Sequence, residues 1–189
     1  MKKWILVLLL IIATVAFCIN KKKKLKRLAV NYEDIPYVDF EIDIKYLITE
    51  VEIDRVKIGD SYTSHKKKLK EAQQKNRTIF FRVFDLYNNE KEKIAFVYID
   101  PFDKKSINTI EIISPHYKTE KGIGVGNTFF ELKKNYPNSE THGSEIEGRT
   151  IVMAGDYHFL LENTIFSSYN VDESKIHPST KIKKIILRK

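Results

Sequence analysis

Two stretches of this chain repeat one another, and the repeat limits the possible folds more than any other feature of the sequence. Residues 56–62 and 123–129, offset by 67 positions, share one pattern: apolar, any residue, apolar, Gly, Asp or Asn, Ser or Thr, aromatic. Two further pairs match in the same order at slightly larger offsets, 77–79 with 149–151 and 107–112 with 182–187. The offset grows because loops absorb insertions. Three ordered matches predict the duplication of a unit of roughly 70 residues.

Each copy is predicted to begin with a strand, a tight glycine turn and a helix. Gly59 and Gly126 stand where the chain must turn sharply, a position that suits a residue without a Cβ atom. The polar residues after each glycine are typical of helix N-caps, and Thr128 with Glu131 forms a capping-box signature. Structural turn and cap roles therefore fall to six residues: Gly59, Asp60, Ser61, Gly126, Asn127 and Thr128.

Two helices of unequal length follow these turns. The first is predicted to run to about residue 76, because its apolar residues recur at helical spacing. This stripe consists of Tyr62, His65, Leu69 and Ala72. The second helix is predicted to end at Tyr136, because Pro137 lacks an amide donor and stops a helix.

Alternating apolar and polar residues predict strands after each helix. The predicted strands cover 78–84, 93–99 and 107–112 in the first unit, 150–154, 157–162 and 181–187 in the second, and 40–46 ahead of both. The predicted fold class is α+β, with two tandem units that each pack a helix on an antiparallel sheet in two layers. The predicted domains are an N-terminal segment at 1–30, a first unit with its leading strand at 31–116, and a second unit at 117–189.

Residues 4–19 form an uncharged apolar run between lysines. As a helix this run would span roughly 24 Å, somewhat short of a hydrocarbon core of about 30 Å. Flanking lysines can snorkel and the bilayer can thin, so the run predicts a single-pass membrane anchor and a membrane partner. A cleaved signal peptide would need small residues just before the cleavage site, and no such site is evident. A lipoprotein would use Cys18 as its lipidated residue, but it would have a small residue where this chain has Phe17. Lipidation of Cys18 and cleavage stay open. The six cations after the run favour a cytoplasmic body by the positive-inside rule, but they could instead lie on anionic lipid headgroups. The orientation of the anchor therefore also stays open.

The positive charge of the protein is concentrated at its N-terminus. Eight of the 33 Lys and Arg residues lie within residues 1–30, which contain no acid, so the other 25 balance the 25 acids of the body. Nucleic-acid binding requires basic charge on the folded domain itself. The sequence therefore argues against a nucleic-acid partner.

The sequence offers little to support catalysis. The glycines at 122–127 do not match a nucleotide-binding loop, and no two of the five histidines have helical metal-ligand spacing. Asp156 and His158 would share a strand face and form an acid–base pair, but such pairs are common on solvated sheets. Cys18, the only cysteine, lies outside the body. We therefore predict no enzymatic activity, no catalytic residues, no metal and no small-molecule cofactor.

Aromatic residues are the remaining candidates for function, at 12% of the chain. Most should fill the core, but some begin helices beside the turns or fall in polar loops, where a binding surface would use them. The protein-binding candidates are Tyr62, Phe129, Tyr87, Tyr117 and Tyr169.

The two glycine turns also carry a family resemblance over residues 50–189. Val56-x-Ile58-Gly59-Asp60-Ser61 and its copy at 123–128 resemble the turn of small envelope domains typified by BamE (SmpA/OmlA), and their tandem arrangement resembles the β-lactamase inhibitor protein. The resemblance implies an envelope-facing, non-catalytic domain that binds other proteins. Together with the predicted anchor, it leads us to expect a membrane-anchored module that binds another protein of the cell envelope, with its body outside the cytoplasm. The alternative that it implies is an inhibitor or immunity-type protein that blocks a target enzyme.

Overall fold

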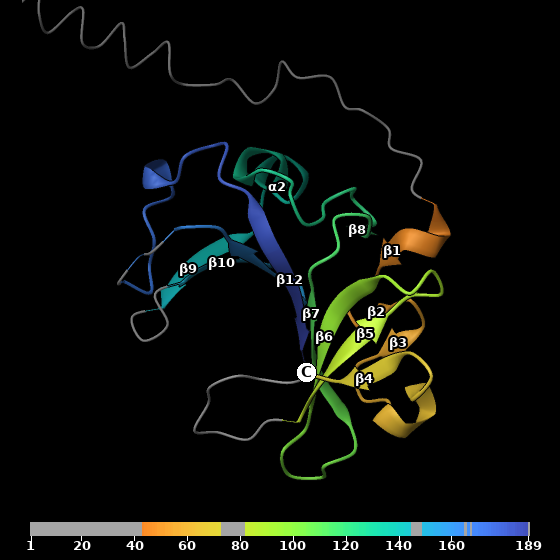
Figure 1. The fold of residues 1–189 in the computed structure, drawn as a ribbon. Helices are drawn as coiled ribbons and strands as arrows, with labels where there is room; N and C mark the ends of the chain where they lie inside the picture. Colours follow the sequence, from red (N-terminus) through yellow and green to blue (C-terminus); the bar gives the residue numbers. More distant parts are fainter. Residues whose placement is uncertain (1–42, 73–81, 145–148, 165, 167, 189) are drawn as a thin grey trace, which may run out of the picture. The chain divides into compact units, whose positions relative to one another are not determined.

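The structure is a computed structural model that describes residues 43–72, 82–144, 149–164, 166 and 168–188 (Figure 1). All of them belong to the compact unit Phe40–Lys189. Two antiparallel meanders of four strands each join side by side to form one eight-stranded sheet. In spatial order its strands are β4 (Leu69–Glu71), β5 (Val83–Tyr87), β6 (Lys93–Ile99), β7 (Ile107–Ile112), β12 (Ile182–Arg188), β11 (Tyr157–Leu161), β10 (Arg149–Ala154) and β9 (Glu140–Ser144).

A smaller sheet and short helices complete the described structure. The small sheet has the order β3 (Val56–Lys57), β2 (Glu52–Ile53), β1 (Leu47–Ile48) and β8 (Lys118–Thr119), in which β1 and β8 are parallel. The helices are the α-helix α2 (Phe129–Asn135) and the 3-10 helices η2 (Ile44–Tyr46), η3 (Tyr62–His65) and η4 (Glu173–Lys175).

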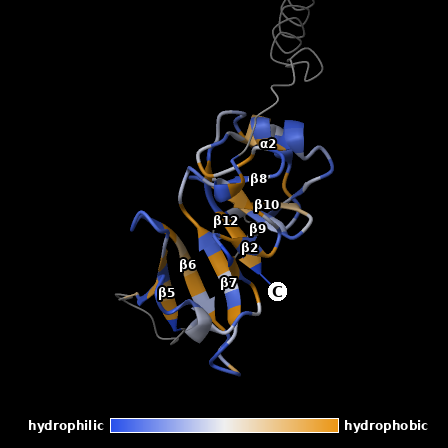
Figure 2. Cartoon of the chain, turned by 90° about the vertical axis from the view of Figure 1, so that its right-hand side faces the viewer, coloured by the Kyte–Doolittle hydropathy of each residue, from blue (hydrophilic) through white to orange (hydrophobic). Residues whose placement is uncertain are grey.

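The core lies between one face of the large sheet, the helix α2 and the small sheet. Buried and partly buried residues alternate over much of β6 and β7, and Figure 2 shows hydrophobic segments along both strands. Ile110 and Phe159 of the large sheet, Leu132 of α2 and Ile48 of the small sheet are all fully buried in one cluster. Burial of each large apolar side chain contributes about 1.5–3 kcal/mol, so this cluster is the main source of stability.

The first glycine turn is tied to the middle of the large sheet by backbone hydrogen bonds. Gly59 has a φ of 92°, and its N–H donates to the Ile107 carbonyl at 2.8 Å. The Ile107 N–H donates in return to the Asp60 carbonyl at 2.8 Å. The Asp60 carboxylate accepts a hydrogen bond from the N–H of Lys57 at 3.1 Å, which closes the turn.

The second turn makes the same bonds 67 residues later. Gly126 has a φ of 87°, and its N–H donates to the Ile182 carbonyl at 2.9 Å. The Ile182 N–H donates to the Asn127 carbonyl at 2.8 Å, and the Asn127 side chain accepts from the N–H of Gly124 at 3.0 Å. Each turn thus anchors the first residue of a central strand, β7 or β12, by an equivalent set of contacts.

The predicted α+β class is wrong, because the described residues are mainly β and contain one α-helix rather than two helix-on-sheet units. Where the stripe predicts the first helix, the chain forms η3 and then enters β4, and residues 73–76 lie outside the described residues. Lys66 and Lys70 are four residues apart and would repel each other in a helix. In β4, by contrast, Leu69 is buried opposite Leu86.

Several predicted elements are confirmed. The strands β6 and β7 have the predicted bounds, and β10, β11 and β12 match to within one residue. The helix α2 begins at the predicted capping box of Thr128 and Glu131 and has Tyr136 as its C-cap. The leading strand is wrong where it is described, because residues 44–46 form η2. Ser61 precedes η3 without a side-chain capping bond.

The predicted single-pass anchor is also corrected. Residues 4–19 lie outside the described residues, and within the described part no helix is long and apolar enough to cross a bilayer. The α-helix α2 has seven residues and spans about 10 Å, against the roughly 30 Å of a hydrocarbon core. The membrane localisation built on that anchor is therefore not retained.

Candidate functional site

The large sheet has a packed face and an open face. The helices contact the packed face: Tyr136 at the end of α2 lies 5.6 Å from Phe159, and Tyr62 of η3 lies 5.2 Å from Phe84, measured between ring centroids. On the opposite face the described residues place no helix (Figure 1). Strand register assigns these residues to that open face: Lys70, Asp85, Tyr87, Phe96, Tyr98, Glu111, His142, Ile151, Met153, His158, Lys184, Ile186 and Arg188.

On the β5–β7 half of the open face, two lysines hold one phenylalanine ring. The Nζ atom of Lys93 lies 4.0 Å from the centroid of the Phe96 ring, and that of Lys184 lies 5.4 Å away. Each lysine also pairs with a carboxylate at 2.7 Å, Lys93 with Asp85 and Lys184 with Glu111. These contacts fix a half-buried aromatic ring between cations on a sheet surface.

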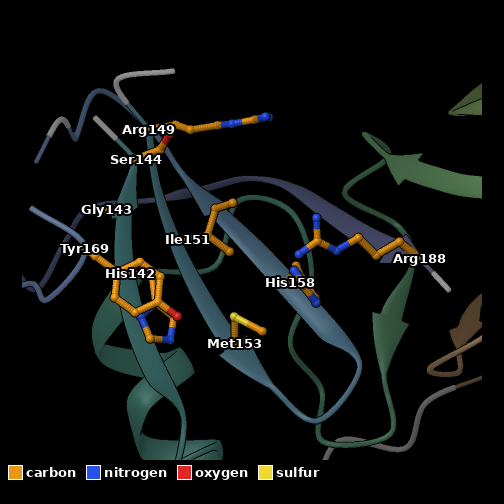
Figure 3. Close-up of a pocket in the computed structure, with 9 residues that line it drawn as sticks. All are labelled: His142, Gly143, Ser144, Arg149, Ile151, Met153, His158, Tyr169 and Arg188. Carbon is orange, nitrogen blue, oxygen red and sulfur yellow. The ribbon is translucent and has the colours of Figure 1, made fainter. Parts of the chain in front are cut away.

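The β9–β12 half of the open face contains a hollow of about 490 Å³ (Figure 3). Ile151 and Met153 of β10 lie at its centre, between the His142–Tyr169 pair and the side chains of His158 and Arg188. All of its described lining residues come from four adjacent strands and the loop before β12. They are His142, Gly143, Ser144, Arg149, Ile151, Met153, His158, Tyr169 and Arg188.

His158 is held in its neutral form. Burial lowers the pKa of its imidazole below the usual value, and the nearby positive charge of Arg188 lowers it further, while Asp156 acts in the opposite direction. Only 7% of the His158 residue is exposed. The predicted neighbour Asp156 is exposed, so the strongest electrostatic partner of this histidine is a cation rather than the expected acid.

One wall of the hollow is a stacked pair of rings. The rings of His142 and Tyr169 lie 4.3 Å apart with an angle of 27° between their planes. The N–H of Gly143 donates to the Tyr169 carbonyl at 3.1 Å, which fixes the loop to the edge of β9. The Nδ1 atom of His142 is buried without a hydrogen-bond partner.

The five aromatic residues predicted to bind a partner lie in different surroundings. Phe129 and Tyr117 are core residues, 6% and 1% exposed. Tyr62 is half-buried, and the Arg82 guanidinium lies 4.8 Å from its ring. Tyr87 lies on the open face, where Lys70 is 4.6 Å from its ring, and Tyr169 is 64% exposed at the hollow. The open face thus brings together only the last two.

Sequence reasoning missed most of the open face. Phe96, Ile151 and Met153 alternate with buried strand residues, so the pattern shows which residues share a face of their own strand. It does not show that β7 and β12 are neighbours, because this pairing joins residues about 75 positions apart. The described residues contain no group of three or more side chains placed to bind a metal ion.

Comparisons with known proteins add information on the fold alone. No protein-family model and no curated protein matches the chain. Among solved structures, the uncharacterised protein YfeY from Escherichia coli is similar, with a TM-score of 0.52 and 12% identity over 77% of this chain and 99% of that one. At such low identity the similarity indicates a shared fold and nothing about activity. The resemblance to BamE-like domains and the β-lactamase inhibitor protein stays a prediction.

Proposed function

We propose that this protein is a non-catalytic protein-binding module and that it binds its partner with the open face of the large sheet. One observation supports this proposal most. The solvent side of an antiparallel sheet normally carries polar residues. Here the outward positions of β6 and β10 include Phe96, Tyr98, Ile151 and Met153, and all four are only partly buried. Apolar surface of this kind is typical of an interaction site.

The ordered side chains of the open face favour tight binding. Phe96 is already fixed by Lys93 and Lys184, and both lysines are paired with carboxylates. A side chain that is ordered before binding loses less conformational entropy in the complex. Aromatic residues in such positions often dominate the binding energy of an interface. We therefore place the centre of the interface at Phe96.

The charge of the open face indicates the chemistry of the partner. Arg149 and Arg188 lie at the hollow, and among the described lining residues there is no carboxylate. Complementary charge increases both specificity and association rate. The partner is therefore a protein with an acidic segment opposite Arg188 and apolar residues opposite Phe96.

A crosslinking experiment tests the proposal. A photoreactive residue in place of Tyr98 should trap a partner, whereas the same residue in place of exposed Lys104, in the loop after β6, should not. The trapped protein is then purified and its affinity measured by calorimetry. Phe96→Ala should weaken binding by at least about tenfold, which corresponds to 1.4 kcal/mol. The thermal unfolding curve of this variant should match that of the wild type. Equal affinity of Phe96→Ala and the wild type would refute the proposal.

The alternative, an inhibitor that blocks an enzyme, is favoured by the loop between β6 and β7. Phe102 is 93% exposed there. The loop is fixed by two aspartates, since Asp100 accepts from the N–H of Phe102 at 2.7 Å and Asp103 accepts from the N–H groups of Lys105 and Ser106 at 2.7 and 2.9 Å. An exposed ring on a rigid loop suits insertion into a pocket. In this case Phe102→Ala, rather than Phe96→Ala, should abolish binding and relieve inhibition.

A further inference from the structure

The hollow on the open face combines positive charge with an apolar floor. Its described lining contains bases and no acids. Ile151 and Met153 are only partly buried and occupy its centre, so they offer apolar surface to a bound molecule (Figure 3). The ionisable bases at its rim are Arg149, Arg188, His142 and His158.

We propose that this hollow binds a carboxylate group attached to a short apolar body. Arg188 pairs with the carboxylate, and Ile151 and Met153 contact the apolar body. The flat wall formed by His142 and Tyr169 limits the width of the body that can enter.

Arg188 is the residue best placed to bind the carboxylate. It is exposed at the end of β12 and lines the hollow, and none of the ion pairs found among the described residues includes it. The guanidinium can donate two parallel hydrogen bonds to a carboxylate, which gives both strength and orientation. Its neighbour His158 is neutral, since burial and Arg188 both lower its pKa. A bound anion would therefore compensate the charge of Arg188 and raise the pKa of His158.

The apolar part of the ligand follows from the floor of the hollow. Ile151 and Met153 point outward from β10, where a site for a bare anion would have polar groups. Covering them stabilises a bound alkyl chain in proportion to the apolar surface that is removed from water. The hollow should therefore prefer an alkyl carboxylate to inorganic phosphate.

The carboxylate that binds in the hollow can come from two sources, and the first of them rests on the proposed function. The carboxylate can belong to an acidic residue beside an apolar residue in the partner protein. It can also belong to a free organic acid, which needs no protein partner. Both sources have the same chemistry at Arg188.

The test uses the full chain and hexanoate as the probe, observed by NMR of labelled backbone amides and histidine side chains. Hexanoate should shift the signals of Ile151, Met153 and His158 saturably, with a dissociation constant in the range of about 1 to 10 mM. Hexanol at equal concentration should cause no saturable shift. Arg188→Gln should weaken hexanoate binding by at least about tenfold. Lys183→Gln removes a cation from the same strand outside the hollow and should leave binding unchanged.

Three results would overturn the inference: no saturation, shifts outside the hollow, or equal binding by wild type and Arg188→Gln. Phosphate binding as tightly as hexanoate would refute the apolar part. Failure of the proposed function gives a different result. If hexanoate binds but Phe96→Ala leaves a purified partner's affinity intact, the hollow is a site for a free organic acid. If hexanoate does not bind but Phe96→Ala weakens partner binding, only the inference fails.

Discussion

The hydroxyl of Tyr157 lies 2.6 Å from a carboxylate oxygen of Glu120 and 3.1 Å from the carbonyl oxygen of Ile48. It therefore connects the large sheet to both the small sheet and the segment that follows β8. Tyr157 is 1% exposed, and burial raises the pKa of its phenol, with the Glu120 carboxylate raising it further. Tyr136 also donates to Glu120, at 3.1 Å. Both phenols stay protonated and act as donors at neutral pH.

Replacement of Tyr157 by Phe should lower the free energy of unfolding by about 1–3 kcal/mol, because the only proton donor shared by the Glu120 carboxylate and the buried Ile48 carbonyl is lost. Urea denaturation followed by circular dichroism measures this change. Tyr87→Phe is the control, since its ring lies on the open face under Lys70 and its hydroxyl makes no hydrogen bond that joins the two sheets. It should change stability by less than about 0.5 kcal/mol. Equal effects of the two variants would contradict the role of the Tyr157 hydroxyl.

The two glycine turns should respond alike to substitution. Gly59 and Gly126 have φ values of 92° and 87°, and a Cβ atom at either position would meet no atom within 4 Å. Alanine should therefore cost only backbone strain, about 1–2 kcal/mol at each site. Thermal unfolding of Gly59→Ala, Gly126→Ala and the double variant measures these costs. If only one of the two substitutions lowered stability, the matching hydrogen bonds of the two turns would not contribute equally to stability.

Stability should depend on pH through His158. Its folded-state pKa is lowered below the ordinary value of 6.5, so the unfolded chain takes up this proton first as the pH falls. The stabilising effect of the neutral imidazole is complete above about pH 6.5 and is lost between that value and the lower folded pKa. The unfolding free energies of the wild type and His158→Gln should therefore differ more at pH 7.5 than at pH 5. A constant difference would contradict this prediction.

The charge of Arg188 should be visible in the titration of His158. Arg188→Gln removes the second cause of the lowered pKa, so the pKa of His158 should rise towards its ordinary value while remaining below it because of burial. Histidine side-chain NMR measures this shift. Lys183→Gln serves as the control for a general change in net charge. Equal shifts in both variants would show that Arg188 has no specific effect.

The sequence pattern within a segment predicted its secondary structure well. The errors arose where contacts between segments far apart in the chain determine the structure. The alternation in β6 and β7 predicted both strands, and the capping box of Thr128 predicted the start of α2. The stripe that contains Leu69 also fits a helix, and only the pairing of β4 with β5 places this residue in a strand. The hollow was not predictable, because its residues become neighbours through the order of β9 to β12.

The central place of β12 has a consequence for synthesis. This strand pairs with β7 on one side and β11 on the other, although it is synthesised after both of them. Until they emerge, β7 and β11 both have unpaired edges, which are prone to join other chains. A nascent or truncated chain that stops before Ile182 should therefore need a chaperone or aggregate, because its two meanders would lack the strand that joins them into one sheet.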